Sequence, residues 1–346
     1  MTLPLTASVV RVPWHTRHGG YDRLLDYLPA GVRVIRPPAT GPARSAATLA
    51  HRVLARRCPL PFYPPEHFAT DLAVLAARGP AHVLYGEEQF WFSRHRTAPT
   101  AVTYHQPPAH LAGLLPHAVW QRLAPRADQV IVLAPDQREF FTRYLPQERV
   151  HLVPHGIDTD AFTPGGAPPP DGRPLVLTVG WWLRDWPVLH AVHDALHRRH
   201  GAGIELAVVT RQAARRRWHP AARVLEGIAE DELIALYRRA AVLLLPLTGA
   251  SANNALLEAL ACGTPAVATD TGGIPHYTGT SPGTVLVPPG DPRAAIEAVA
   301  TVLGEWGTAA HAERRAAARA RAEHFSWPRI ARQLGSIHAL LQGEGR

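Results

Sequence analysis

The chain has 346 residues, more than one hydrophobic core usually holds, so we expect two domains of about 150 to 170 residues. The net charge of +8 could suggest a nucleic-acid partner, but all 36 basic residues are arginine, as composition bias across a genome would produce. We therefore predict no nucleic-acid partner, and at most a weak contact with a membrane surface or an acidic acceptor. The absence of an apolar stretch of about 18 residues predicts a cytoplasmic protein, and Cys58 and Cys262 are too few for a disulfide framework.

The first half of the chain alternates short apolar runs with helical patterns. The runs are "ASVVRV", "VRVIRP", "AHVLYG", "PTAVTYH", "QVIVLA" and "RVHLVP". Gly19 and Gly20 follow the first run, where main chain can approach a phosphate or a sugar, although a plain turn fits two glycines equally well. Glu87 and Glu88 follow the third run, and we take Glu88 as the acid that could orient or deprotonate a substrate hydroxyl.

The segment 151–174 is rich in Pro, Gly and Asp and is typical of an interdomain linker. Beyond it, "LVLTVG", "IELAVVT", "AAVLLLP", "PAVATD" and "TVLVPP" alternate with helical patterns. Two such series predict two doubly wound α/β domains with an active site in the cleft between them. We place the domains at 1–152 and 175–325, the linker at 153–174, and a C-terminal helix that returns to the first domain at 326–346.

The segment 251–273, "SANNALLEALACGTPAVATDTGG", carries a single acid. It follows an apolar strand at 241–246 and predicts a helix from Asn254 to Cys262, a stop at Gly263 and a strand at 265–269. In such a βαβ unit the ligand crevice lies beyond the carboxyl ends of the strands, here bordered by 248–254 and 270–274.

Two features of this crevice together describe a nucleotide. The amides of Asn253, Asn254 and Ala255 at the helix start favour an anion such as phosphate. Glu258 lies one turn deeper, and a carboxylate can accept hydrogen bonds from both hydroxyls of a ribose. The alternative is that Asn253 is only an N-cap and Glu258 only a solvated helix acid.

Several segments resemble, in order and spacing, the family-four retaining glycosyltransferases of the GT-B architecture. They are "ADQVIVLAPDQREFFTRYLPQERVHLVPHGIDTDAF", "LVLTVG", "VLEGIAEDELIALYRRAAVLLLP", "LLEALACGTPAVATDTGGIP" and "FSWPRIARQL", within residues 127–335. The resemblance implies sugar transfer from a nucleotide-diphosphate donor without an essential metal. It also implies that Glu258 holds the ribose, that His105 contacts the donor sugar, and that the loop with Gly227 and Ile228 reads the base through its main chain. A structural loop histidine is the alternative for His105.

The chain departs from the family pattern at the sugar and phosphate positions. Ala250 stands where the family usually has a first glutamate, and Asn253 replaces a glycine. Trp181 and Trp186 occupy the places of the usual Arg and Lys, so Arg184 is the candidate cation for the diphosphate, unless it is a surface residue paired with Asp185. Ordinary hexoses would then be held by Ser251, Asn253 or main-chain amides, or the donor sugar is modified.

From the sequence we therefore expect a glycosyltransferase that uses a UDP-, dTDP- or GDP-linked sugar as substrate, with no cofactor and no metal. Its acceptor would be a small molecule or a lipid-linked molecule. A GT-B sugar phosphorylase or epimerase is one alternative. A nucleotide-sugar-binding protein without catalysis is another, because Ala250 replaces an acid.

Overall fold

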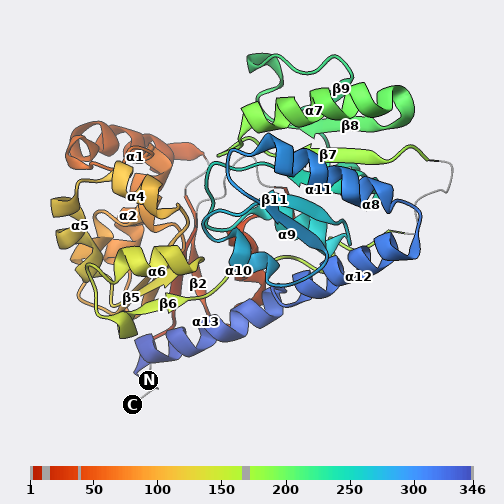
Figure 1. Cartoon of the computed structure of the whole chain (residues 1–346). Coiled ribbons are helices and arrows are strands. Elements are labelled where there is room, and N and C mark those ends of the chain that lie inside the picture. The colour runs from red at the N-terminus through yellow and green to blue at the C-terminus, as the bar shows by residue number, and fades with distance from the viewer. Residues whose placement is uncertain (1–2, 10–15, 38–39, 166–171, 344–346) are drawn as a thin grey trace. The chain divides into compact units, whose positions relative to one another are not determined.

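The computed structural model describes residues 3–9, 16–37, 40–165 and 172–343, which form two compact units (Figure 1). The first unit contains the chain up to Gly156, apart from Thr16–Gly19, and the C-terminal segment from Trp327 onward. The second unit contains Thr16–Gly19 and Ile157–Ser326. The chain thus passes from the first unit to the second between Gly156 and Ile157, within the segment expected to be a linker.

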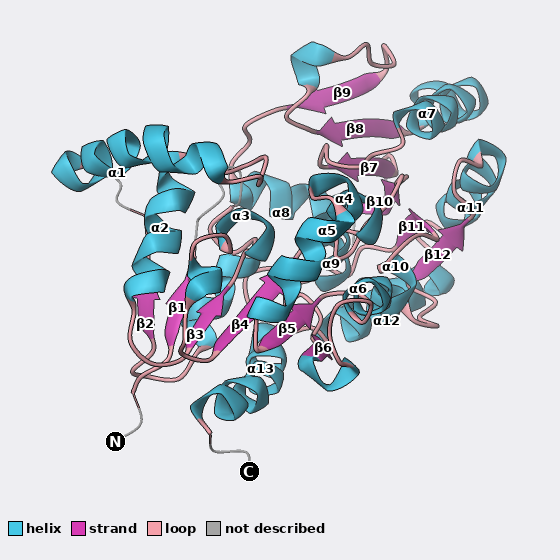
Figure 2. Ribbon diagram, turned by 90° about the vertical axis from the view of Figure 1, so that its left-hand side faces the viewer, coloured by secondary structure: helices cyan, strands magenta, loops and turns pink. Residues whose placement is uncertain are grey.

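The first unit is built on a parallel six-stranded sheet in the order β2-β1-β3-β4-β5-β6, and Figure 2 shows these strands side by side. Its strands are β1 (Thr6–Ser8), β2 (Arg33–Ile35), β3 (Ala81–Val83), β4 (Thr100–Tyr104), β5 (Gln129–Val132) and β6 (Val150–Leu152). Its helices are α1 (Gly41–Leu54), α2 (Pro65–Ala76), α3 (Gly86–Gln89), α4 (Pro108–Leu114), α5 (His117–Leu123), α6 (Pro135–Phe141) and α13 (Trp327–Gln342). Short 3-10 helices are η1 (Tyr21–Tyr27), η2 (Ala55–Arg57), η3 (Ser93–His95), η4 (Ala124–Arg126) and η5 (Gln147–Arg149).

The second unit has a parallel six-stranded sheet in the order β12-β11-β10-β7-β8-β9. Its strands are β7 (Leu175–Val179), β8 (Glu205–Val209), β9 (Ala222–Leu225), β10 (Ala240–Leu245), β11 (Ala266–Thr269) and β12 (Thr284–Val287). Its helices are α7 (Trp186–His200), α8 (Glu230–Arg239), α9 (Asn254–Ala261), α10 (Ile274–Thr278), α11 (Pro292–Gly304) and α12 (Ala309–Glu323), with 3-10 helices η6 (Gly201–Gly203) and η7 (Ala213–Arg215).

The two sheets confirm the predicted pair of doubly wound α/β domains. Every apolar run singled out in the sequence contains a strand, although residues 10–12 of the first run and 166–171 of the linker lie outside the described residues. One strand, β9, is not predicted by the sequence pattern. It is four residues long, lies at the edge of its sheet and has no fully buried residue, so it lacks the continuous apolar run that marks a buried parallel strand.

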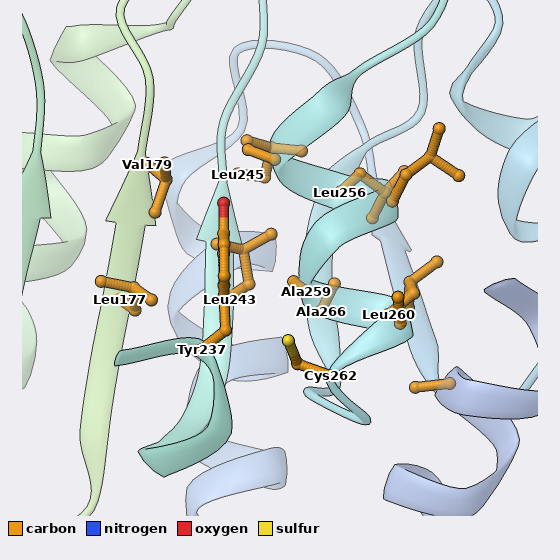
Figure 3. Packing of buried hydrophobic residues seen from close by; sticks show 14 of the residues in the cluster. Leu177, Val179, Tyr237, Leu243, Leu245, Leu256, Ala259, Leu260, Cys262 and Ala266 are labelled. Carbon is orange, nitrogen blue, oxygen red and sulfur yellow. The ribbon is translucent and has the colours of Figure 1, made fainter. Parts of the chain in front are cut away.

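The second sheet is covered by hydrophobic clusters on both faces. All six residues of β10 are buried, with Leu243 and Leu245 facing one cluster and Val242 and Leu244 the other. Helix α9 packs into the first cluster, and Figure 3 shows its Leu256, Ala259 and Leu260 beside this strand. Burial on both faces explains why the strand reads as an unbroken apolar run rather than an alternating one.

Helix α13 belongs to the first unit although it ends the chain. Its Trp327 is buried and its ring meets Tyr21 edge-on, with ring centroids 5.6 Å apart. Further along the helix, Nε2 of His338 lies 3.0 Å from Nδ1 of His82 on β3. These contacts attach the C-terminal helix to the sheet of the first unit.

Candidate functional site

The strand order of the second sheet has its switch point between β7 and β10, because the chain runs outward from this pair in both directions. Ligands of doubly wound proteins bind beyond the carboxyl ends of the strands at such a point. The loop after β7 carries Arg184, and the loop after β10 leads to α9. Main-chain hydrogen bonds join the two loops, from Asp185 to Pro246 and from Thr248 to Leu183, both 3.0 Å long. The predicted crevice is thus bordered by residues that the sheet topology brings together.

The loops 248–254 and 270–274 also meet, as the sequence predicted. The amide of Gly273 donates to the carbonyl of Ala250 over 2.9 Å. Gly272 has a φ of 53°, and a Cβ atom there would come within 2.0 Å of the same carbonyl oxygen. Only glycine fits such a close approach, so this turn holds the two borders of the crevice in contact.

The start of α9 is organised by Asn253. Its side-chain Oδ1 accepts a 3.1 Å hydrogen bond from the amide of Leu256, so Asn253 is indeed an N-cap. The cap leaves the amides of Asn254 and Ala255 at the helix end, where the helix dipole favours an anion. Ser251 is buried, and among the residues the structure describes no group bonds to its hydroxyl. A buried unsatisfied hydroxyl is uncommon and is a candidate for ligand contact.

Glu258 is buried rather than solvated, which contradicts the alternative reading of a solvated helix acid. Its Oε2 accepts a 2.8 Å hydrogen bond from the hydroxyl of Tyr237 on α8. Burial raises the pKa of Glu258 to about 8, although the bond from Tyr237 lowers it and the charge of Glu230 raises it further. Gly19 packs against the same carboxylate, since a Cβ atom there would lie 3.2 Å from Oε1.

Thr16–Gly19 is fixed to the second unit through Glu230 at the start of α8. The amide of His18 donates to Oε1 of Glu230 over 2.9 Å, and its Nδ1 lies 2.7 Å from Oε2. Burial would raise the pKa of Glu230, but hydrogen bonds from Thr16 and His18 bring it below its ordinary value. This carboxylate therefore stays ionised and holds the loop that contains Gly19, whereas Gly20 has a φ of 90° and precedes η1 in the first unit.

Arg184 is buried in the loop after β7 and does not pair with Asp185, which caps α7 instead. Its Nε–H and Nη2–H donate to the carbonyl of Val179 and its Nη1–H to that of Trp182, over 3.1, 2.6 and 2.9 Å. Burial lowers the pKa of Arg184 to about 10, so it is charged at neutral pH. Three of its N–H groups thus shape its own loop, and a guanidinium has two more that can meet a phosphate.

Gly227 and Ile228 lie between β9 and α8. Gly227 has a φ of 68°, a conformation that glycine adopts readily. Ile228 is partly buried against the same cluster that contains α9. The assignment of this loop to the base of a nucleotide stays a prediction.

In the first unit the switch point falls between β1 and β3, and the third strand leads into Glu87 and Glu88 on α3. Glu87 is turned inward, and its Oε1 accepts hydrogen bonds from the amides of His105 and Gln106 over 2.8 and 3.0 Å. Burial raises the pKa of Glu87 to about 8 and that of Glu88 to about 7. Glu88 keeps a quarter of its side chain exposed and lies 3.6 Å from Nδ1 of His67.

His105 follows β4 and is held on several sides. Its Nε2 lies 2.7 Å from the carbonyl of Leu84, and its ring stacks on Tyr85 at 4.6 Å between centroids and meets the edge of Tyr21 at 4.7 Å. The structure thus places His105, Glu87 and Glu88 close together at the carboxyl end of the first sheet. The contact with the donor sugar expected of His105 stays a prediction.

Two residues of the second-unit site, Tyr237 and Glu230, are not predicted by the sequence pattern. Both lie on α8, whose apolar residues recur at helical spacing, so Tyr237 reads as an ordinary core aromatic. Its partnership with Glu258 depends on how α8 and α9 pack. Within the part of the chain that the structure describes, no three or more His, Cys, Asp or Glu side chains form a group able to hold a metal ion, and no helix is long and apolar enough to cross a bilayer.

Both halves of the chain match known protein families. Residues 20–161 match the family model described as Glycosyltransferase Family 4, and residues 174–305 match the model described as Glycosyl transferases group 1. Among solved structures, sucrose-phosphate synthase from Thermosynechococcus elongatus superposes with a TM-score of 0.71 at 20% identity, covering 98% of this chain and 99% of its own. Anabaena HepE in complex with UDP superposes with a TM-score of 0.69 at 15% identity, covering 98% and 100%.

Curated relatives match over shorter stretches. MMP alpha-(1→4)-mannosyltransferase of Mycolicibacterium hassiacum is 28% identical over 210 residues, which are 55% of this chain and 48% of that protein. D-inositol 3-phosphate glycosyltransferase of Corynebacterium efficiens is 33% identical over 117 residues, which are 34% of this chain and 27% of that protein. The chain thus matches about a quarter to a half of the length of these relatives. With both family models matched and the fold shared, the chain belongs to the family-four, group 1 glycosyltransferases of the GT-B architecture.

Proposed function

We propose that this chain transfers a sugar from a nucleotide-diphosphate donor to a hydroxyl of a small or lipid-linked acceptor, with retention of the anomeric configuration. The donor would carry UDP, dTDP or GDP and would bind in the second unit. The observation that carries this proposal is the burial of Glu258 beside the helix start of α9 at the switch point of the sheet. The carboxylate of this buried acid would accept hydrogen bonds from the ribose hydroxyls, and the amides at the helix start would bind the phosphates.

The charge that develops on the leaving diphosphate needs stabilisation from groups already in place. Arg184 is charged and held rigid by its bonds to Val179 and Trp182, and the amides of Asn254 and Ala255 lie at the start of α9. Hydrogen-bond donors that are already in position stabilise the developing negative charge without having to move during the reaction. They therefore supply the leaving-group half of the mechanism.

The acceptor half is assigned to the first unit. Burial brings the pKa of Glu88 to about 7, so this carboxyl can exchange a proton with an acceptor hydroxyl near neutral pH. Glu87 holds the amides of His105 and Gln106 and is a positioning residue. The names of the relatives, an inositol-phosphate glycosyltransferase and a mannosyltransferase, agree with hydroxyl acceptors.

The experiment that tests the proposal is a scan of UDP-, dTDP- and GDP-sugars for slow hydrolysis with no acceptor present. An enzyme of the proposed kind should release nucleoside diphosphate from one donor class, and Glu258→Gln should reduce the rate. The matched control is Glu232→Gln, because Glu232 is an exposed acid on α8 with 46% of its side chain accessible. Tight nucleotide-sugar binding without any turnover would favour the non-catalytic binding protein that Ala250 suggests. Formation of sugar phosphate only when inorganic phosphate is added as the group that receives the sugar would favour a phosphorylase.

A further inference from the structure

Helix α1 presents an apolar surface that the proposed sugar transfer does not use. None of its residues is fully buried, and the side chains of Leu49 and Val53 are 66% and 67% exposed. Leu54 and Phe62, just beyond, are 46% and 64% exposed. These four are most of the large hydrophobic side chains exposed in the described chain. Because these exposed side chains are concentrated within residues 49–62 instead of being scattered along the chain, this segment is a candidate interaction surface.

The apolar side chains of α1 share its outward face with arginines. Leu49 and Val53 are four residues apart on α1 and Arg52 lies beside them, while Arg56 follows on η2; all four residues are exposed. Ala50 on α1 and Ala55 on η2 are partly buried and pack against the core of the first unit. Both views show α1 beside α2 at the margin of this unit (Figures 1 and 2). The helix is therefore anchored on one side and presents Leu, Val and Arg on the other.

The charge around α1 is positive well beyond composition bias. No Asp or Glu occurs from Leu28 to Pro65, where the average frequency of acids in this chain would give about three. The same stretch contains the arginines Arg33, Arg36, Arg44, Arg52, Arg56 and Arg57. Of these, Arg44 pairs with Glu66 over 2.8 Å. The use of arginine instead of lysine holds for the whole chain and follows from biased composition. The absence of Asp and Glu is specific to this segment.

An anionic membrane matches both features better than a second copy of the chain or a nucleic acid does. A second copy of the chain would bring the same arginines against one another, and a nucleic acid would leave Leu49, Val53 and Phe62 in water. An anionic bilayer surface takes apolar side chains into the boundary between headgroups and acyl chains and places arginines at lipid phosphates. A surface pocket beside the helix end, lined by His51, Arg52, Arg56 and Tyr63 among others, offers cationic groups to a headgroup.

We propose that α1 and the segment through Phe62 bind the surface of an anionic membrane, with Leu49, Val53 and Phe62 inserted and Arg52, Arg56 and Arg57 at the lipid phosphates. This surface lies outside the donor site and does not depend on the proposed sugar transfer. It would bring a lipid-linked acceptor and the enzyme to the same interface.

The test is flotation of the full chain with vesicles of phosphatidylcholine alone or with about one third phosphatidylglycerol, at about 0.1 M and about 0.5 M salt. We expect binding only to the anionic vesicles, weakened by the higher salt. The double variant Arg52→Gln/Arg56→Gln should lower the partition coefficient about tenfold to thirtyfold, since each arginine at an anionic surface contributes about 1 kcal/mol. The variant Leu49→Ser/Val53→Ser should lower it about tenfold or more through lost apolar burial.

Matched controls separate this surface from general charge and hydrophobicity. Arg198→Gln/Arg199→Gln removes the same charge from two exposed arginines of α7, and Leu340→Ser removes an exposed leucine of α13. Neither control should change vesicle binding, and donor hydrolysis should be unchanged in all variants. Equal binding to uncharged vesicles, or unchanged binding of Leu49→Ser/Val53→Ser, would overturn the proposal. The proposal would also be overturned if the wild type bound no vesicles and formed a dimer that Leu49→Ser/Val53→Ser dissociates. In that case a second copy of the chain would cover this face.

Discussion

The hydroxyl of Tyr237 donates a 2.8 Å hydrogen bond to Oε2 of Glu258 and so joins α8 to α9 in the interior of the second unit. Figure 3 shows the ring of Tyr237 among Leu177 and Leu243 with its hydroxyl toward the carboxyl ends of the strands. Burial raises the pKa of Tyr237 well above its ordinary value, the charge of Glu258 raises it further, and Arg184 lowers it. The phenol is therefore a permanent donor, and it fixes the orientation of the acid that we assign to the ribose.

Glu258→Gln should weaken binding of the diphosphate nucleotide by about 1 to 3 kcal/mol, the scale of a lost hydrogen bond to a charged group. The fold should be retained, because glutamine keeps an oxygen that can accept from Tyr237. Isothermal titration calorimetry with UDP, dTDP and GDP measures the change, and Glu232→Gln is the control. Unchanged affinity would contradict the ribose assignment.

The raised pKa of Glu258 adds a proton-linkage test. With a pKa of about 8 the free carboxyl is mostly protonated at pH 7, whereas ribose hydroxyls donating to the carboxylate would favour its charged form. Nucleotide binding should therefore release a proton near pH 7 and tighten as the pH rises toward 8. Calorimetry in buffers of different ionisation enthalpy measures that release. Glu258→Gln should show neither effect.

Arg184→Ala should reduce affinity for the diphosphate nucleotide far more than for the bare nucleoside, because only the former presents phosphate oxygens to the guanidinium. The structure adds a second effect, since the change also removes the hydrogen bonds to Val179 and Trp182. We expect a lower melting temperature as well. An equal loss of affinity for nucleotide and nucleoside would mean that Arg184 acts only on its loop.

Ser251→Ala tests how the site holds a sugar without the family's first glutamate. The carbonyl of Ala250 already accepts from Gly273, and Oδ1 of Asn253 already caps α9. The hydroxyl of Ser251 is buried without a hydrogen-bond partner among the described residues, so we expect this group to meet the sugar. If it does, Ser251→Ala should lower kcat/KM for the preferred donor about twofold to tenfold, within the range of a single neutral hydrogen bond. Its stability should be unchanged or slightly higher, because an unsatisfied polar group is removed.

Competition between glucose-type and deoxysugar donors then decides the donor class. A site that offers few hydrogen-bonding partners to sugar hydroxyls discriminates weakly against a sugar that lacks one of these hydroxyls. We therefore expect a donor with a modified sugar to compete well with the glucose-type donor. A large preference for the glucose-type donor that survives Ser251→Ala together with Asn253→Ala would argue against this account.

Glu87→Gln should flatten the dependence of stability on pH. The pKa of Glu87 is about 8 in the folded chain and lower when unfolded, so the folded state holds a proton that the unfolded state loses. The resulting stability is complete below the unfolded pKa and is lost as the pH rises through about 8, at up to about 1.4 kcal/mol per pH unit. Urea denaturation at pH 5 and pH 8 should show a smaller difference for Glu87→Gln than for the wild type. An equal difference would mean that Glu87 is ionised in the folded chain.

The amino-acid pattern is sufficient to predict both sheets apart from β9, the βαβ unit around α9, and the position of Glu258 one turn inside that helix. These features follow from local causes, namely apolar runs buried on both faces, an Asn cap and a glycine stop, which act over a few residues. The edge strand β9 could not be predicted in this way, because it is partly exposed and therefore lacks a continuous apolar run.

The groups that these residues contact could be identified only from the folded chain. Tyr237 reaches Glu258 across 21 residues and Glu230 reaches His18 across 212, and Arg184 turns toward Val179 and Trp182 rather than Asp185. A carboxylate or guanidinium in a sequence has the same chemistry wherever it lies. Its burial, its pKa and its partners depend on packing between elements, which no local pattern records.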